Sequence, residues 1–392
     1  MIRQIYMLTT LLLTAVTATA QNPLEQLLVS IEQNNPTLRA ERYSVEGRKY
    51  ESRMDNSLGP LSVMYNSVVG SAKDLGKAGE LEVTQTIDLP MLYVSRSRVA
   101  RELAQQYDAE YMQLRQEILM NAQELYIELC TLERIKKLND ERLGAAKHIA
   151  ELFARRYQTG DVTALEKNRA EFEYMLLQEQ FSADCMRIIE LKSQLALLNG
   201  GEMPLDRYEM PLLSSVPSAD QLLYDWEQNA PQIEIMRSRR SVAAEQTRLS
   251  RRNALPSLAL GYKHEYGDGE FFSGFIAGLE IPIFSNRNNV KRAKAEEYAA
   301  VTASENATCE IRAFVSELHD KLLYLESLLQ SLGDTPDADE YIAVMNNLLD
   351  SGQIDITEYY SELDIFYSAL EARLRIEMNY LIGFAQLNVI YL

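Results

Sequence analysis

The chain has 392 residues, with 57 acidic and 39 basic side chains, a formal net charge of −18 and 46% hydrophobic residues. This apolar content excludes a disordered chain, and the acidic balance argues against a nucleic-acid-binding protein, because phosphate binding depends on Lys and Arg. Only 17 Gly and 11 Pro indicate long uninterrupted elements, mainly helices. Because the three cysteines and three histidines are widely scattered, we expect no disulfide framework, no metal site and no cofactor.

The first twenty residues have the pattern of a secretory signal peptide. Arg3 gives a basic start, residues 8–16 form a short apolar run, and residues 18–20 have the small-x-small pattern of a cleavage site. We therefore expect an exported protein whose mature chain begins at Gln21. Since Gln rather than Cys follows the expected cleavage site, we do not expect a lipoprotein. No later stretch approaches 18 consecutive apolar residues, so no membrane-spanning helix is predicted.

The mature chain contains an internal repeat. Residues 26–36 recur at 221–231 with seven identities in eleven positions at a constant offset of 195. Residues 87–90 and 159–162 are paralleled by 279–282 and 351–354 at an offset of 192. We interpret the chain as two copies of one unit of about 190 residues, the first over 21–205 and the second over 206–392.

Each copy has a helical segment, over 36–57 in the first copy and 231–253 in the second, that ends before a proline and is followed by two strand-like runs. The runs are residues 61–69 and 81–89 in the first copy, and 257–266 and 271–281 in the second. Their alternation of apolar and polar side chains predicts strands. A membrane barrel needs about eight strands, so four strands from one chain cannot close one. We therefore expect the strands to pair between chains, and three chains would supply twelve.

After Pro90, apolar residues recur at steps of three and four as far as Tyr157, and no proline follows until Pro204. This spacing predicts one helix of about 65–70 residues, roughly 100 Å long, which requires a coiled-coil-like neighbour. The chain then turns at Gly160, and a shorter helix covers 162–198. The second copy repeats the pattern with a turn at Gly352, although Gly333 and Pro336 are expected to break its long helix.

Several of these segments resemble the TolC-type outer-membrane efflux proteins. The resemblance rests on residues 26–28 leading to 34–38, on residues 278–284, and on the Tyr157-x-x-Gly160 turn, together with the duplication and the proline positions. It implies a mainly α fold with a small transmembrane β-barrel. Three chains would form an α-helical barrel in the periplasm, continued by a twelve-stranded β-barrel with four strands per chain. The chain departs from the family pattern at Leu349, which stands where the first copy has Tyr157, and at Pro336.

The resemblance also implies a function. It predicts a homotrimeric exit duct, not an enzyme, in the outer membrane of a Gram-negative bacterium. Such a duct contacts outer-membrane lipid and works with a periplasmic adaptor and an inner-membrane pump of the RND or ABC type. The alternatives are the outer-membrane component of type I protein secretion and a soluble periplasmic coiled-coil scaffold. An exported hydrolase is disfavoured, because no catalytic constellation of side chains stands out.

Three sets of candidate site residues follow. The resemblance assigns the helix turns to a periplasmic tip where an adaptor docks, formed by Tyr157, Gly160, Val162, Gly352 and Ile354. Acidic residues beside the turns form either helix-end caps or an entrance ring that favours cations; these are Asp161, Asp350 and Asp355.

The third set consists of aromatic strand residues that suit a lipid-facing surface: Tyr65, Tyr262, Tyr266, Phe271 and Phe275. A soluble sheet with one face on a core would show the same alternation. Pro90 and Pro282 mark the expected junctions between strand and helix. The single tryptophan, Trp226, is interpreted as a packing residue in the middle of the helical part.

Overall fold

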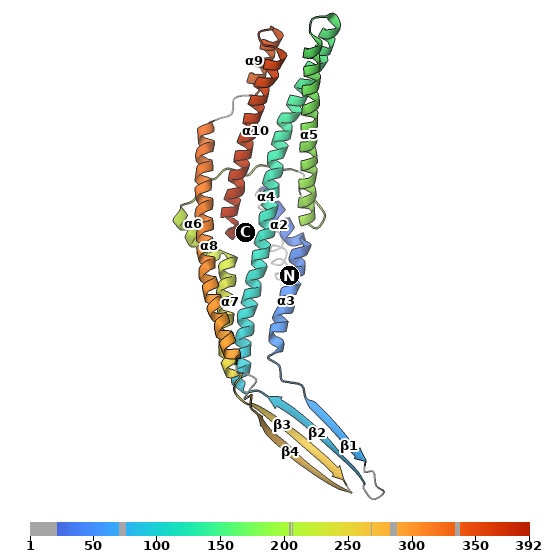
Figure 1. Ribbon diagram of the computed structural model, residues 1–392, viewed down its shortest axis with the longest axis vertical. Coiled ribbons are helices and arrows are strands. Elements are labelled where there is room, and N and C mark those ends of the chain that lie inside the picture. Colours follow the sequence, from blue (N-terminus) through green and yellow to red (C-terminus); the bar gives the residue numbers. More distant parts are fainter. Residues whose placement is uncertain are drawn as a thin grey trace, which may run out of the picture.

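The computed structural model describes residues 22–69, 76–203, 205, 207–267, 269–282, 288–333 and 338–392. The molecule is long and narrow, with a β-sheet at one end and two helix turns at the other (Figure 1). The signal peptide expected over residues 1–20 lies outside the described residues.

The sheet has four antiparallel strands in the order β1-β2-β3-β4. These are β1 (Ser62–Val69), β2 (Lys77–Ile87), β3 (Ser257–Gly267) and β4 (Glu270–Glu280). The central pair, β2 and β3, contains one strand from each copy. Each outer strand, β1 and β4, has one edge without a strand partner among the described residues.

The strand expected over 81–89 differs from the observed β2 at both ends. It begins earlier because Lys77, Ala78 and Gly79 pair with the end of β1, although their composition is typical of a loop. It ends at Ile87, because Leu89 is already the N-cap of the following helix and Pro90 is that helix's first residue. The other three strands begin and end within one residue of the expected ranges.

The helices of the first copy are α2 (Pro23–Asn34), α3 (Pro36–Met54), α4 (Pro90–Thr159) and α5 (Ala164–Leu198). Helix α4 is a continuous helix of 70 residues, as the spacing predicts. The shorter helices α3 and α5 lie along its two halves, one toward the sheet and one toward the turns (Figure 1). The helical segment expected over 36–57 corresponds to α3, whereas α2 was not predicted as a separate helix. The separation lies at Asn35, whose side-chain oxygen accepts a hydrogen bond from the Leu38 N–H at 3.0 Å.

The second copy contains α6 (Ala219–Asn229), α7 (Pro231–Arg252), α8 (Asn289–Leu332), α9 (Ala338–Asp350) and α10 (Ile356–Leu387), followed by a short 3₁₀ turn, η1 (Val389–Tyr391). Helices α7 and α10 lie end to end between α4 and α8 (Figure 1).

The second copy departs from the first at both ends of its long helix. Helix α8 ends at Leu332, directly before Gly333, which has a φ of 62°. Pro336, the other expected breaker, lies outside the described residues. Pro282 lies outside the helix, and α8 is described from Asn289, so Pro282 does not repeat the role of Pro90 as a first helical residue.

The buried apolar side chains form several separate cores along the length of the molecule. In the first copy, α2, α4 and α5 meet around Leu27, Ile31, Leu191 and Leu195, all of which are fully buried. In the second copy, α6, α8 and α10 meet around residues that include Trp226, at 4% exposure. A third core lies at the turns and joins both copies. None of the helices in the described part of the chain has an apolar stretch that could cross a membrane.

Candidate functional site

The register of the sheet places all five candidate lipid-facing residues on one face. Directly paired residues on neighbouring strands point to the same side. Tyr262 pairs with Phe275, and Tyr266 pairs with Phe271. Tyr65 pairs with Leu81 of β2, and Tyr262 pairs with Val83 of the same strand. Leu81 and Val83 are two positions apart, so they point to the same side, and Tyr65 shares the face of Tyr262. The rest of this face is largely aliphatic: Val63, Val69, Leu81, Val83, Ile87, Leu258, Leu260, Ala277 and Leu279.

The opposite face carries nearly all the charged residues of the sheet: Glu80, Glu82, Lys263, Glu265, Glu270 and Glu280. The Lys263 ammonium lies 3.1 Å from the Glu80 carboxylate on the neighbouring strand. The rest of the chain does not cover the apolar face, where Tyr65 is exposed by 62%, Phe271 by 72% and Phe275 by 92%. A soluble sheet would bury this face, so the alternative of a sheet packed on its own core does not hold for the single chain.

A glycine fixes the position of one aromatic ring on the apolar face. A Cβ at Gly79 would lie 2.4 Å from the ring of Tyr266, so only glycine leaves room for the ring across β2. The ring reaches β1, where the hydroxyl groups of Tyr266 and Tyr65 lie 2.8 Å apart. Tyr266 therefore ties the first copy to the second through a side-chain contact on the apolar face.

At the other end of the molecule, both helix turns have the same backbone geometry. In the first, Gly160 has a φ of 85°, and the Asp161 N–H donates to the Arg156 carbonyl at 2.9 Å. In the second, Gly352 has a φ of 71°, and the Gln353 N–H donates to the Leu348 carbonyl at 2.9 Å. Both are Schellman-type ends, which favour glycine because a Cβ disfavours a positive φ.

The helix that follows each turn begins with a capping box, of which the sequence analysis anticipated only Asp355 as a helix-end cap. Thr163 and Glu166 form one at the start of α5, and Asp355 and Glu358 form the other at the start of α10. In each box the first side chain accepts a backbone N–H of the first turn, and the glutamate accepts the N–H of the capping residue. The spacing Thr-x-x-Glu or Asp-x-x-Glu directly after a turn glycine is the signal that identifies it.

The two turns meet in one apolar core. Val162 and Ile354 are partly buried against it, from the first and the second turn respectively. Leu349, which replaces the tyrosine of the first copy, is 8% exposed and belongs to this core. Tyr157 instead stays 45% exposed, with the Lys167 ammonium 5.9 Å from the centre of its ring. The departure from the family pattern at Leu349 therefore exchanges an exposed tyrosine for a core residue.

The three candidate acidic residues are all exposed at this end of the molecule, but their contacts differ. Asp355 caps α10, accepting the N–H groups of Thr357 and Glu358 at 2.7 and 2.8 Å. The Asp161 carboxylate accepts the Thr159 hydroxyl at 2.5 Å. The capping interpretation is thus correct for Asp355. Elsewhere in the described ranges, no three His, Cys, Asp or Glu side chains gather closely enough to hold a metal ion.

Comparisons with known proteins agree with this architecture. No family model matches the chain. The outer membrane protein TolC of Vibrio cholerae is 22% identical over 238 residues, an alignment that covers 56% of this chain and 54% of the relative. The chain therefore spans about half the length of the curated relative it matches.

Solved structures match over nearly the whole chain. A membrane protein from Pseudomonas aeruginosa has a TM-score of 0.78 and 17% identity, covering 94% of this chain and 89% of its own. The Campylobacter jejuni CmeC outer membrane channel has a TM-score of 0.76 and 17% identity, in a match that covers 94% of this chain and 85% of the channel. The chain has the TolC-type fold.

Within this TolC-type fold, the candidate residues fall into two groups at opposite ends of the molecule. The aromatic strand residues share the apolar sheet face, and the acidic residues flank the glycine turns. The sheet and the turns lie at opposite ends of the molecule (Figure 1). The structure therefore brings together the members of each group that the sequence proposed, and keeps the two groups apart by the length of α4.

The capping box of Thr163 and Glu166 is expected to make the stability of the first turn of α5 depend on pH. The hydrogen bonds from the Thr163 hydroxyl and N–H lower the pKa of Glu166. A carboxyl with a lowered folded pKa contributes stability above its unfolded pKa and loses it as the pH falls through the folded pKa. We expect amide exchange at the start of α5 to increase below about pH 4, the ordinary carboxyl range, relative to intrinsic rates. Hydrogen–deuterium exchange read by mass spectrometry measures this.

The matched variants are Glu166→Ala and Glu179→Ala, because Glu179 is an exposed carboxylate in the middle of the same helix. Glu166→Ala should raise exchange in the first turn of α5 at neutral pH and remove the pH effect, whereas Glu179→Ala should leave both unchanged. Equal exchange at the helix start in all three proteins would contradict the assignment.

Proposed function

We propose that this chain forms an outer-membrane exit duct, a passive channel rather than an enzyme. The observation that carries the proposal is the combination of an exposed apolar sheet face with a helix of 70 residues that begins directly after the sheet. A lipid bilayer is the environment that suits such a face, and an aqueous space suits helices with this much charge. A soluble coiled-coil scaffold would have no use for the exposed aromatic face.

We propose that three copies assemble. Every neighbouring pair in the sheet is antiparallel, so β1 and β4 run in opposite directions, and β4 of one copy could continue the ladder onto β1 of the next. Four strands from each of three copies give twelve, enough to close a barrel and remove both free edges. Closure would also place the apolar face of every copy on the outside of the barrel, toward lipid.

The outer helices support the same assembly. Helix α5 borders one side of the chain and exposes large apolar side chains along its length: Leu165, Phe172, Leu176 and Ile189, each between 60% and 80% exposed. Helix α8 borders the other side and exposes Tyr298 and Tyr324 by 73% and 68%. Neighbouring copies would cover both surfaces and close the helices into a tube.

The partners proposed for this duct are a periplasmic adaptor and an inner-membrane pump of the RND or ABC type. The two duplicated turns would present six similar surfaces around the rim of a trimer, suited to a ring of adaptor hairpins. Their shared backbone geometry also supports the division into copies over 21–205 and 206–392. The pump would set the cargo, whether small molecules or, as in type I secretion, proteins.

The first test concerns the sheet, where neighbouring residues on β1 provide a matched pair. Tyr65 lies on the apolar face and Asn66 on the opposite face, and both are exposed. Tyr65→Lys should cost about 2–4 kcal/mol if the residue is near the middle of the bilayer, and should lower the yield of heat-resistant trimers. Asn66→Lys should assemble normally. Equal yields from both variants in an outer-membrane fraction would exclude a lipid-facing role for Tyr65.

The second test concerns the turns. Valine at Gly160 and Gly352 should strain each turn by about 1–2 kcal/mol, because both glycines have a positive φ. Trimers should persist, while crosslinking to the adaptor is lost and the cells become sensitive to the pump's substrates. Gly144→Val is the control, since Gly144 lies inside α4 with nothing within 4 Å of its Cβ position. Normal export by the double variant would refute docking at the turns.

The third test concerns ion selectivity. If Asp161, Asp350 and Asp355 surround the entrance, the reconstituted channel should prefer cations, most clearly at low salt where screening is weak. Replacing all three with Asn should reduce the preference and preserve the cap at position 355, because Asn caps helices as well as Asp does. Single-channel reversal potentials in a salt gradient measure the preference. Anion selectivity in the parent channel would rule out the ring.

A further inference from the structure

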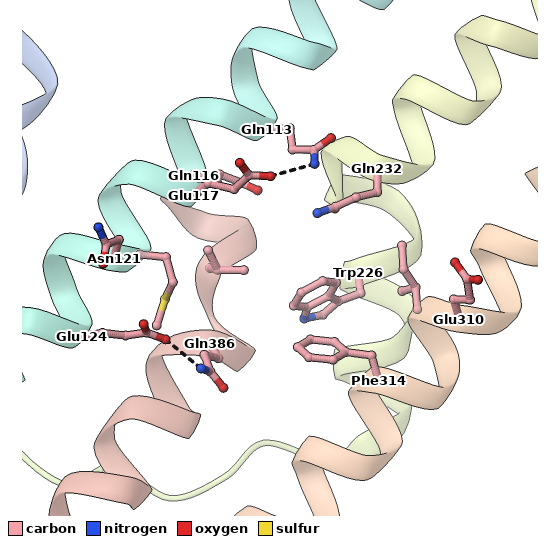
Figure 2. A pocket seen from close by; sticks show the side chains of 13 residues that line it. Gln113, Gln116, Glu117, Asn121, Glu124, Trp226, Gln232, Glu310, Phe314 and Gln386 are labelled. Carbon is pink, nitrogen blue, oxygen red and sulfur yellow. Dashed lines mark hydrogen bonds between the residues drawn. The ribbon is translucent and has the colours of Figure 1, made fainter. Parts of the chain in front are cut away.

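A cavity of about 520 Å³ lies halfway along the helical part of the molecule. It occupies the place where the end of α10 and the start of α7 meet between α4 and α8. Side chains from these four helices line it, together with Trp226 of α6 and Val389 of η1 (Figure 2). Its volume is within the range of pockets that hold small organic ligands. The cavity is built from a single chain and lies far from both the sheet and the turns.

The two sides of the cavity differ in chemistry. Glu117 and Glu124 of α4 face the aromatic side chains of Trp226 and Phe314 across it, and Glu310 of α8 also belongs to the lining (Figure 2). The centroids of the two aromatic rings lie 5.4 Å apart, and the ring planes are inclined to each other by 59°. No lysine or arginine belongs to the described lining. A wall of carboxylates opposite a pair of aromatic rings is the arrangement that attracts an organic ammonium group.

Nearby arginines do not neutralise these carboxylates. Arg115 directly precedes the lining residue Gln116 in the sequence, and Arg312 directly follows Ile311. Both guanidinium groups instead pair with carboxylates that do not belong to the lining. Arg115 makes two hydrogen bonds to Glu32, at 2.6 and 2.8 Å, and Arg312 donates to Glu227 at 2.6 Å. The two α4 carboxylates instead accept neutral amides, Glu117 from Gln113 at 2.8 Å and Glu124 from Gln386 at 2.7 Å. The negative charge of the cavity is therefore left without a counter-ion from the described lining.

One amide oxygen of the lining lacks a partner. The Oε1 atom of Gln232 is buried and has no hydrogen-bond partner among the described residues. Gln116, which is only 6% exposed, also belongs to the lining. Buried amides are normally hydrogen-bonded, because leaving one unpaired is destabilising. A bound molecule with an N–H donor, such as a protonated amine, would satisfy this oxygen.

The duplication shows that the aromatic rings and Glu310 are features of the second copy alone. At the positions equivalent to Trp226, Glu310 and Phe314, the first copy has Ile31, Ile118 and Ala122. Ile31 and Ala122 are fully buried in the apolar core there. The same junction between stacked helices is thus filled with small aliphatic side chains in one copy and lined with a carboxylate and two aromatic rings in the other.

We propose that this cavity binds an organic cation, a protonated or quaternary amine with an apolar body. The ammonium group would lie beside Glu117 and Glu124, and the apolar body would lie against Trp226 and Phe314. This proposal goes beyond the duct function and does not depend on it, because the cavity needs neither a membrane nor an adaptor.

The sequence provides its own reporter, since Trp226 is the chain's single tryptophan. The experiment titrates benzyltrimethylammonium into the purified full-length protein in detergent and follows Trp226 emission, with calorimetry as a second readout. N-benzylacetamide is the neutral analogue of similar size, and benzenesulfonate is the anionic one. We expect saturable binding of the cation, at least about tenfold tighter than of either analogue, and weaker at high salt.

The double variant Glu117→Gln with Glu124→Gln should weaken cation binding by about tenfold and leave binding of N-benzylacetamide unchanged. Glu305→Gln is the matched control, because Glu305 is an exposed carboxylate on α8 outside the lining, and it should bind like the parent. Equal affinity for the cation and the neutral analogue would overturn the proposal. So would unchanged affinity in the double variant, or no binding by either readout.

Discussion

A helix of 70 residues is about 105 Å long and has to cover its apolar side chains along that whole length. No single partner of ordinary size does this, so α4 is flanked on each side by two shorter helices placed end to end. Each pair leaves a junction in the middle, where one helix ends and the next begins, and where backbone groups need new partners. In the first copy, the Asn35 amide donates to the Leu198 carbonyl at 2.8 Å. In the second, the Trp226 indole donates to the Leu387 carbonyl at 2.9 Å.

Local patterns in the sequence predicted most of the architecture. Alternation at residues such as Tyr262 indicated the strands, and the unbroken spacing after Pro90 indicated the long helix. Both signals depend only on neighbours in the chain, which is why they were reliable. The start of β2 was missed because Lys77 and Gly79 have low strand propensity, and only pairing with β1 brings them into the sheet. Helix α2 was also missed, although the start of α3 directly after the capping residue Asn35 was predicted correctly.

The candidate sites were predictable to different degrees. Gly160 and Gly352 marked the turns correctly, since a positive φ is a property of the residue itself. The role of Asp355 required the structure to choose between a cap and a free charge. The cavity beside Trp226 was not predictable at all. Its walls come from helices in both copies, and whether a tryptophan packs closely or borders a hollow depends on what stands opposite, here Phe314 and the carboxylates of α4.

The two ends of the molecule join the copies by different kinds of contact. At the sheet, β2 and β3 are held by a ladder of main-chain hydrogen bonds, in which a slip of one residue would turn every side chain to the wrong face. At the turns, the copies meet through apolar side chains such as Val162 and Ile354, whose attraction has little directional preference. The first end is therefore stiff against sliding, and the second is compliant. Under load along its axis, the molecule would yield at the turns while the sheet kept its register.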